Sequence, residues 1–142
     1  MKKIAILFSI LLSTIVLPFS NTVKAQENIM IDDFVTTINA ACPAELFEGI
    51  TLLNMVNREG SVLMDCSTSL VDLKDNEAAS KMLKTYLEKE CVDMMSEDED
   101  WELFICLLAM DEKALVFRFP VEGTKPVLVA FSLQEVVSWI NE

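Results

Sequence analysis

The stretch ITLLNMVNREGSVLMDCS, residues 50–67, decides the fold class of this 142-residue chain. Two runs rich in leucine, valine and methionine flank Arg58-Glu59-Gly60, and the glycine supplies the positive φ that a tight turn needs. The stretch therefore predicts a β-hairpin with strands over 50–57 and 61–67. In the second strand Val62, Met64 and Cys66 alternate with polar residues, so we expect these three side chains to face the core.

The segments on either side of the hairpin have helical and strand-like patterns. Apolar spacing of three to four residues predicts helices over 29–42 and from Asp75 or Asn76 to Met94. Ser132 and Glu135 form a capping box that opens a short final helix. Strands are predicted over 101–110, 114–119 and 127–131. The prediction is an α+β domain in the order α-β-β-α-β-β-β-α, with an antiparallel sheet of four to five strands and helices packed on one face.

The first 25 residues are predicted to be a cleaved signal peptide. Lys2 and Lys3 precede an apolar run over residues 4–17, and Val23-Lys24-Ala25 places small or modest side chains at the cleavage positions, so cleavage is expected after Ala25. The apolar run is shorter than a membrane span. We expect residues 26–142 to form a single compact domain, exported to the periplasm or the extracellular medium, with no membrane insertion after cleavage.

The predicted mature chain is strongly acidic. It would have 117 residues, of which 23 are acidic and 8 basic, which gives a net charge of −15. This charge repels phosphate backbones and anionic headgroups, so neither nucleic acid nor a membrane surface is expected as a partner. Four of the acidic residues are consecutive, over residues 97–100. Because neighbouring side chains of an extended segment point in opposite directions, we expect a solvated turn there rather than a calcium loop.

Several kinds of catalytic and cofactor chemistry lack their usual residues. The chain contains no histidine, and its three glycines are isolated, which speaks against histidine-dependent nucleophilic catalysis and a phosphate-binding loop. We therefore predict no catalytic residues, no cofactor and no metal. The abundant carboxylates leave one enzymatic alternative open, a small carboxylate-dependent hydrolase.

The four cysteines all belong to the predicted mature chain and fall on predicted apolar faces. An even number in an oxidising compartment favours at least one disulfide among Cys42, Cys66, Cys91 and Cys106, with four free thiols as the alternative. Their spacing contains no C-x-x-C pair, which argues against thioredoxin-like redox chemistry and a zinc ribbon.

Three residues form a candidate interaction surface. Arg118 projects from the polar side of an apolar strand, and Trp101 and Trp139 lie near the ends of predicted elements, where partial exposure is expected.

A loose motif connects the first half of the mature chain with known proteins. The pattern Ile38-Asn39, Cys42-Pro43, Leu46, Gly49-Ile50, Leu52 and Gly60 resembles small exported bacterial α+β domains of unassigned function. This resemblance implies export and the fold class, and it transfers no activity. The leading hypothesis is a soluble, non-enzymatic domain that binds a protein or an envelope component. The alternatives are a small-ligand carrier, with a pocket between sheet and helices, and the carboxylate hydrolase.

Overall fold

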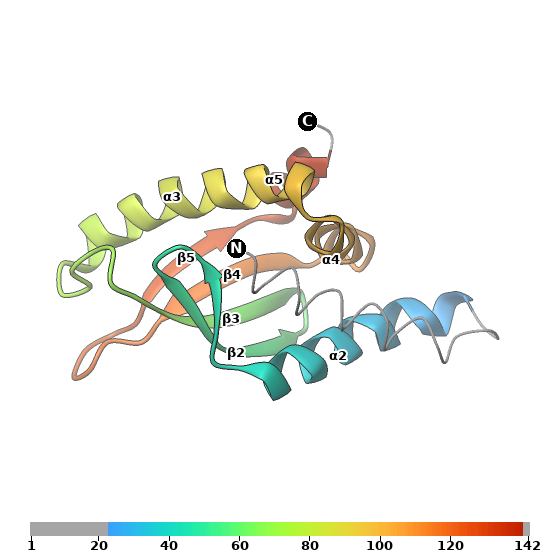
Figure 1. Ribbon diagram of the computed structural model, residues 1–142, viewed down its shortest axis with the longest axis horizontal. Helices are drawn as coiled ribbons and strands as arrows, with labels where there is room; N and C mark the ends of the chain where they lie inside the picture. Colours follow the sequence, from blue (N-terminus) through green and yellow to red (C-terminus); the bar gives the residue numbers. More distant parts are fainter. Residues whose placement is uncertain (1–22, 141–142) are drawn as a thin grey trace.

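The computed structural model describes residues 23–140, and their side chains from residue 31 onward. This part of the chain is an α+β fold in which a five-stranded sheet carries four helices (Figure 1). The strand order is β1-β2-β3-β4-β5. The elements are α2 (Val23–Ala41), β1 (Ala44–Phe47), β2 (Ile50–Arg58), β3 (Ser61–Thr68), α3 (Asn76–Glu97), α4 (Glu99–Met110), β4 (Ala114–Phe119), β5 (Val127–Phe131) and α5 (Leu133–Ile140).

The predicted hairpin over residues 50–67 is confirmed. β2 and β3 pair antiparallel with Met55 opposite Met64, and Gly60 adopts a φ of 81° in the turn. The pairing shifts between Leu52 and Asn54, which marks a β-bulge. Consecutive residues Leu53 and Asn54 are both exposed at this point, as expected when a bulge places two residues opposite one.

The three predicted helices are confirmed and correspond to α2, α3 and α5. The Asp75 side chain accepts a hydrogen bond from the Ala78 amide and caps α3, whose buried stripe includes Leu83, Leu87 and Cys91. Met82, directly before Leu83 in the sequence, lies outside this stripe and is 59% exposed. At α5 the capping box forms as predicted: the Ser132 amide donates to Glu135 Oε1 over 3.1 Å, and the Glu135 amide donates to Ser132 Oγ over 3.2 Å.

The strand predicted over residues 101–110 is wrong, because this segment is helix α4. Asp98, placed in a solvated turn by the sequence analysis, is the N-cap and accepts hydrogen bonds from the Asp100 and Trp101 amides. Glu99 and Asp100 occupy the first turn, where negative charge complements the helix dipole. The acidic run is therefore a junction between two helices rather than a turn before a strand.

The sheet also differs from the expected antiparallel arrangement at one pair. β3 and β4 are parallel, with Asp65 beside Arg118, whereas the other three pairs are antiparallel. The chain between β3 and β4 crosses over through α3 and α4, and such a crossover returns the chain parallel to the first strand. The short β1, directly after the Cys42-Pro43 cis peptide bond, was not predicted.

The core lies between the sheet and the helices and is rich in aromatic rings. Phe47 of β1 contacts Trp101 edge to face, and Trp101 contacts Phe104, with ring centroids 5.6 and 5.7 Å apart. At the other end, Phe131 contacts Phe117 and Trp139 edge to face. Leu115, Phe117 and Phe119 of β4 and alternate residues of β5 point into this core.

Helix side chains form hydrogen bonds with backbone groups near both edges of the sheet. On one side Asn39 of α2 donates to the Met55 carbonyl and accepts from the Met55 amide, at 2.8 and 2.7 Å, where β2 extends beyond β1. On the other side Ser80 and Lys84 of α3 donate to the Leu128 and Ala130 carbonyls of β5, each over 3.0 Å. These contacts hinder another strand from adding at either place.

Candidate interaction surface on the sheet

We call the face of the sheet that points away from the core the outer face. Two rows of side chains on this face follow from the strand register. The strand register aligns Val56, Leu63, Val116 and Ala130 in one row across β2 to β5. The next row consists of Asn54, Asp65, Arg118 and Leu128. None of these eight residues belongs to the core cluster.

The outer face combines apolar side chains with one ion pair. Leu53 and Leu128, at opposite sides of the sheet, are 42% and 52% exposed. Between them Arg118 Nε and Nη2 donate to the two carboxylate oxygens of Asp65, over 2.5 and 3.0 Å. This is the bidentate geometry in which an arginine–carboxylate pair is most directional. Arg118 is therefore an anchored residue on a largely apolar surface rather than a solvated side chain.

The ion pair presents its two partners unequally. The Asp65 side chain is 12% exposed and uses both oxygens on Arg118, whereas the Arg118 side chain is 36% exposed. Within the described residues the Nη1 nitrogen of Arg118 makes no hydrogen bond. The surface thus offers hydrogen-bond donors, held in a fixed direction, beside apolar side chains.

The two tryptophans of the predicted interaction surface lie elsewhere. Trp101 is fully buried, and its indole Nε1 donates to the Cys91 carbonyl over 3.0 Å. Trp139 is 3% exposed and contacts the Phe131 ring edge to face. The expectation of partial exposure is wrong for both, because α4 and α5 turn their apolar sides, and with them these rings, toward the core. Of the three candidates, Arg118 alone lies on the outer face.

All four cysteines are free thiols, so the favoured disulfide is not formed and the alternative of free thiols describes the structure. Cys66 and Cys91 are buried, whereas Cys42 and Cys106 are half-buried. Burial raises the pKa of each thiol, and like charges, such as Asp65 beside Cys66, add to the effect. A raised pKa opposes thiolate formation, which favours a packing role for these side chains.

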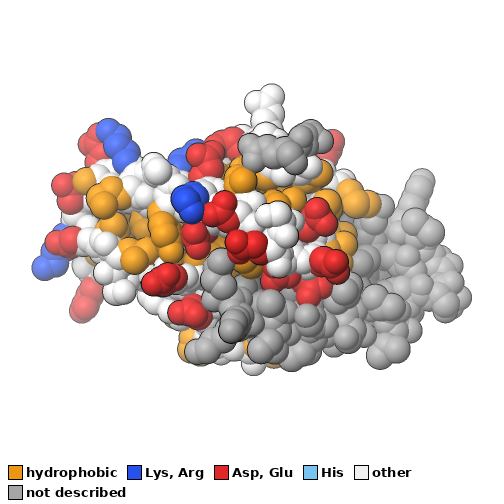
Figure 2. All heavy atoms as spheres, turned by 45° about the horizontal axis from the view of Figure 1, so that its top comes forward, with side chains coloured by type: hydrophobic (Ala, Val, Ile, Leu, Met, Phe, Trp, Pro, Cys, Tyr) orange, Lys and Arg blue, Asp and Glu red, His pale blue; other side chains and the backbone are white. Residues whose placement is uncertain are grey.

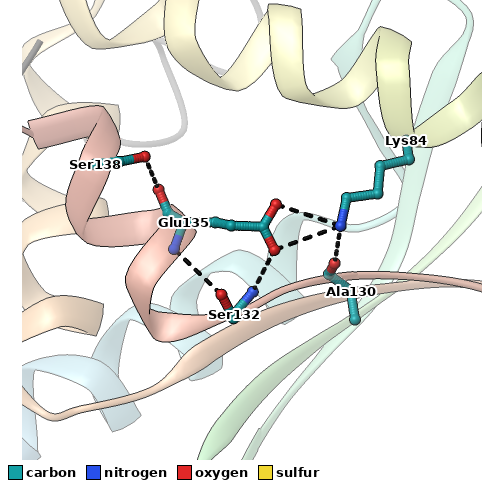
Figure 3. Close-up of polar contacts among 5 residues, drawn as sticks. All are labelled: Lys84, Ala130, Ser132, Glu135 and Ser138. Carbon is teal, nitrogen blue, oxygen red and sulfur yellow. Dashed lines mark hydrogen bonds and ion pairs between the residues drawn. The ribbon is translucent and has the colours of Figure 1, made fainter.

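A polar cluster connects α3, β5 and α5 (Figure 3). Lys84 donates to the Ala130 carbonyl and pairs with Glu135, and it also lies over the Phe131 ring. Burial opposes ionisation of Glu135, but the Ser132 amide and Lys84 outweigh burial and lower its pKa. The cluster therefore locks the start of α5 against α3, and its carboxylate is held ionised rather than poised as a general acid.

Glu90 has the raised pKa that the hydrolase hypothesis requires of one carboxylate. Burial is the main cause, and the charges of Asp93, Glu97 and Glu48 add to it. However, the surface hollow of about 480 Å³ between α3 and α5 is lined by Glu88 and Asp93 and not by Glu90. Among the described residues, no group of three or more His, Cys, Asp or Glu is arranged to hold a metal ion.

The surface around α3 is dominated by acidic side chains, with few basic ones between them (Figure 2). The lysines of α3 that lie there are paired: Lys81 with Glu77, and Lys89 with Asp93. The outer face of the sheet differs from this surface, because its one positive group keeps donors that its acidic partner does not use. Within residues 23–140 no helix combines the length and hydropathy that crossing a bilayer requires.

Comparisons with known proteins identify the fold alone. A scan against protein-family models finds no match, and neither does a search of curated proteins. The chain is similar to the crystal structure of a Pseudomonas aeruginosa protein that is provisionally described as secreted, with a TM-score of 0.55 and 12% identity. The match covers 82% of this chain and 99% of the other. The α+β fold is therefore shared with that protein.

Proposed function

We propose that this chain is an exported, non-enzymatic domain that binds another protein or an envelope component through the outer face of its sheet. The observation that carries the proposal is the apolar row of that face, bordered by the exposed Leu53 and Leu128 and by the anchored Arg118. Contiguous apolar surface next to directed polar groups is typical of interaction sites.

The arrangement of the sheet favours binding by the face over binding by an edge. Asn39 occupies backbone groups of β2, and Ser80 and Lys84 occupy those of β5, so a strand adding at β5 or along the part of β2 that extends beyond β1 would have to displace helix side chains. The space between sheet and helices, where a carrier would hold its ligand, is filled by buried rings, among them Phe104 and Phe117. These features support a partner on the surface over a ligand in the interior.

Export is supported by the sequence of the first 25 residues, with its two lysines, apolar run and cleavage signal after Ala25. The shared fold with a protein described as secreted agrees with it. N-terminal sequencing of the protein from fractionated cells tests this part. We expect Gln26 as the first residue, in the envelope or medium fraction. A chain that keeps Met1 and stays in the cytosol would contradict export.

The binding surface can be tested by site-specific photo-crosslinking in the cells that produce the protein. A benzophenone amino acid replaces Val116 or Leu128 on the outer face, or Met82 on α3, which is more exposed than either. We expect the two outer-face positions to capture the same partner and the Met82 position to capture none or a different one. Equal capture from Met82, or no capture from the outer face, would overturn the proposal.

A further inference from the structure

We propose that the partner of the outer face is an extended protein segment that places a carboxylate on Arg118 and an apolar side chain on the neighbouring row. The inference rests on the proposed function and specifies its partner. It starts from the ion pair: Asp65 is satisfied and nearly buried, whereas Arg118 remains one-third exposed with Nη1 unused. The group that such a fork recognises is an acceptor, and a carboxylate is the strongest acceptor that a protein offers.

Charge complementarity on this face points in the same direction. Apart from Asp65 and Arg118, its two rows contain only apolar side chains and one asparagine. Because Asp65 uses both oxygens on Arg118, a ligand approaching these two rows meets arginine donors and no unpaired carboxylate. A basic ligand group would find only the neutral Asn54 amide as an acceptor in these rows and would lie against the guanidinium.

The spacing of the two rows favours an extended segment. Val116 and Arg118 are two residues apart on one strand, so their side chains are separated by about 7 Å along it. An extended partner that runs along β4 repeats at the same distance on one of its faces. It can therefore place an apolar side chain over Val116 and a carboxylate at Arg118 with residues i and i+2. Leu128 and Leu53 lie on either side of this line and can contact apolar neighbours.

Selection from a phage library of nine-residue peptides tests the inference. The full chain is immobilised at 150 mM salt, and peptides are selected on the wild type and counter-selected on Arg118→Gln. We expect enrichment of peptides in which an aspartate or glutamate lies two residues from an apolar residue. A selected peptide, synthesised with its acid replaced by the amide, should bind about tenfold more weakly to the wild type. On Arg118→Gln the two peptides should bind within about twofold of each other.

Two controls separate the alternatives. Lys81→Gln removes one positive charge from α3, far more exposed than Arg118, and should leave the preference for the acid unchanged. Near-UV and far-UV circular dichroism spectra, compared with those of the wild type, test whether Arg118→Gln is folded. A library that yields no acidic preference, no binding peptide, or the same peptides on Arg118→Gln overturns the inference. So does Arg118-dependent binding of laurate without any acidic peptide, because the partner would then be a fatty acid.

The failure of this inference is distinguishable from the failure of the proposed function. If photo-crosslinking from Val116 and Leu128 captures one partner, the outer face is the binding surface whatever the peptides show. If that partner binds equally well to the wild type and to Arg118→Gln, the surface stands and its assignment to an acidic segment falls. If neither Val116 nor Leu128 captures a partner, both the proposed binding surface and the acidic partner segment are overturned.

Discussion

On β4, Leu115, Phe117 and Phe119 enter the core, whereas Val116 and Arg118 alternate with them on the outer face. The same strand thus supplies a buried face covered by helices and a face that no helix of the described chain covers. The inner residues are large, apolar and fully buried, whereas the smaller Val116 and the charged Arg118 are both half-buried. In the proposed function, the inner face supplies stability and the outer face binds the partner. Substitutions at paired positions can break or sharpen this comparison.

The accessibility of the thiols should show the largest difference. Cys66 and Cys91 lie in the core, whereas Cys42 and Cys106 are half-buried. We expect iodoacetamide to label Cys42 and Cys106 at least about 100-fold faster than the other two in the native protein, because buried thiols react only after opening. The rates should rise with pH, since the thiolate is the reactive form, and for Cys42 and Cys106 the rise should extend to higher pH than for a free thiol, because burial raises the pKa of both. Mass spectrometry of tryptic peptides measures the rates, and four labels on the unfolded, unreduced protein would verify that no disulfide exists.

Adjacent substitutions on β4 compare the two faces in free energy. Phe117→Ala removes a fully buried ring that contacts Phe131 edge to face, and we expect a loss of about 3–5 kcal/mol of unfolding free energy. Val116→Ala on the outer face should cost about 1 kcal/mol or less. Urea denaturation measures both. Equal losses would mean that the outer face is part of the core and would weaken its assignment as an interaction surface.

The sequence predicted this division of faces where the pattern was local. Alternation in residues 114–119 and 61–67 identified the inward side chains, and the caps Asp75 and Ser132 identified the helix starts. Residues 101–110 misled because they form a nearly continuous apolar run, which suits a buried strand as well as a buried helix. Asp98 followed by an acidic first turn was the signal that could have decided for a helix.

The ion pair on the outer face depends on the pairing of β3 with β4, which could not be predicted from the sequence. Asp65 and Arg118 were each recognised as outward residues, but they are 53 positions apart and meet only because β3 and β4 are parallel. Reading residues 101–110 as a strand placed an extra strand between β3 and β4 in the predicted order, so the direct pairing of β3 with β4 was not predicted. The exposure of Trp101 was misjudged for the same reason, since a helix turns this ring inward.

The comparison extends to the turns of the two hairpins. Gly49, between β1 and β2, and Gly60, between β2 and β3, have φ values of 80° and 81°. A Cβ at Gly49 would lie 2.6 Å from Leu70, whereas at Gly60 it would meet nothing within 4 Å. We expect Gly60→Ala to cost about 1 kcal/mol and Gly49→Ala more, up to about 2. Adding Leu70→Ala to Gly49→Ala should remove the excess; if it does not, the contact with Leu70 is not its cause.

The smallest effect is expected where α5 joins the inner face. Ser132→Ala removes the acceptor of the Glu135 amide and should cost about 1 kcal/mol. Glu135→Gln keeps an acceptor for the Ser132 amide and removes only the charge that pairs with Lys84. Because this pair is more than one-third exposed on the lysine side, we expect about 0.5 kcal/mol or less at pH 7.

The pH dependence distinguishes the two contributions. The folded protein lowers the pKa of Glu135, so the stabilisation by its charge is complete above the unfolded value of about 4.3 and is lost as pH falls through the folded pKa. The difference between wild type and Glu135→Gln should therefore shrink as pH falls below the unfolded pKa and disappear once Glu135 is protonated in the folded protein, whereas the cost of Ser132→Ala should persist in part, because a hydroxyl acceptor does not titrate. Thermal unfolding of the three proteins from pH 3 to pH 7 measures this. A Glu135→Gln difference that stays constant with pH would mean that packing, and not the charge on Lys84, holds α5 against α3.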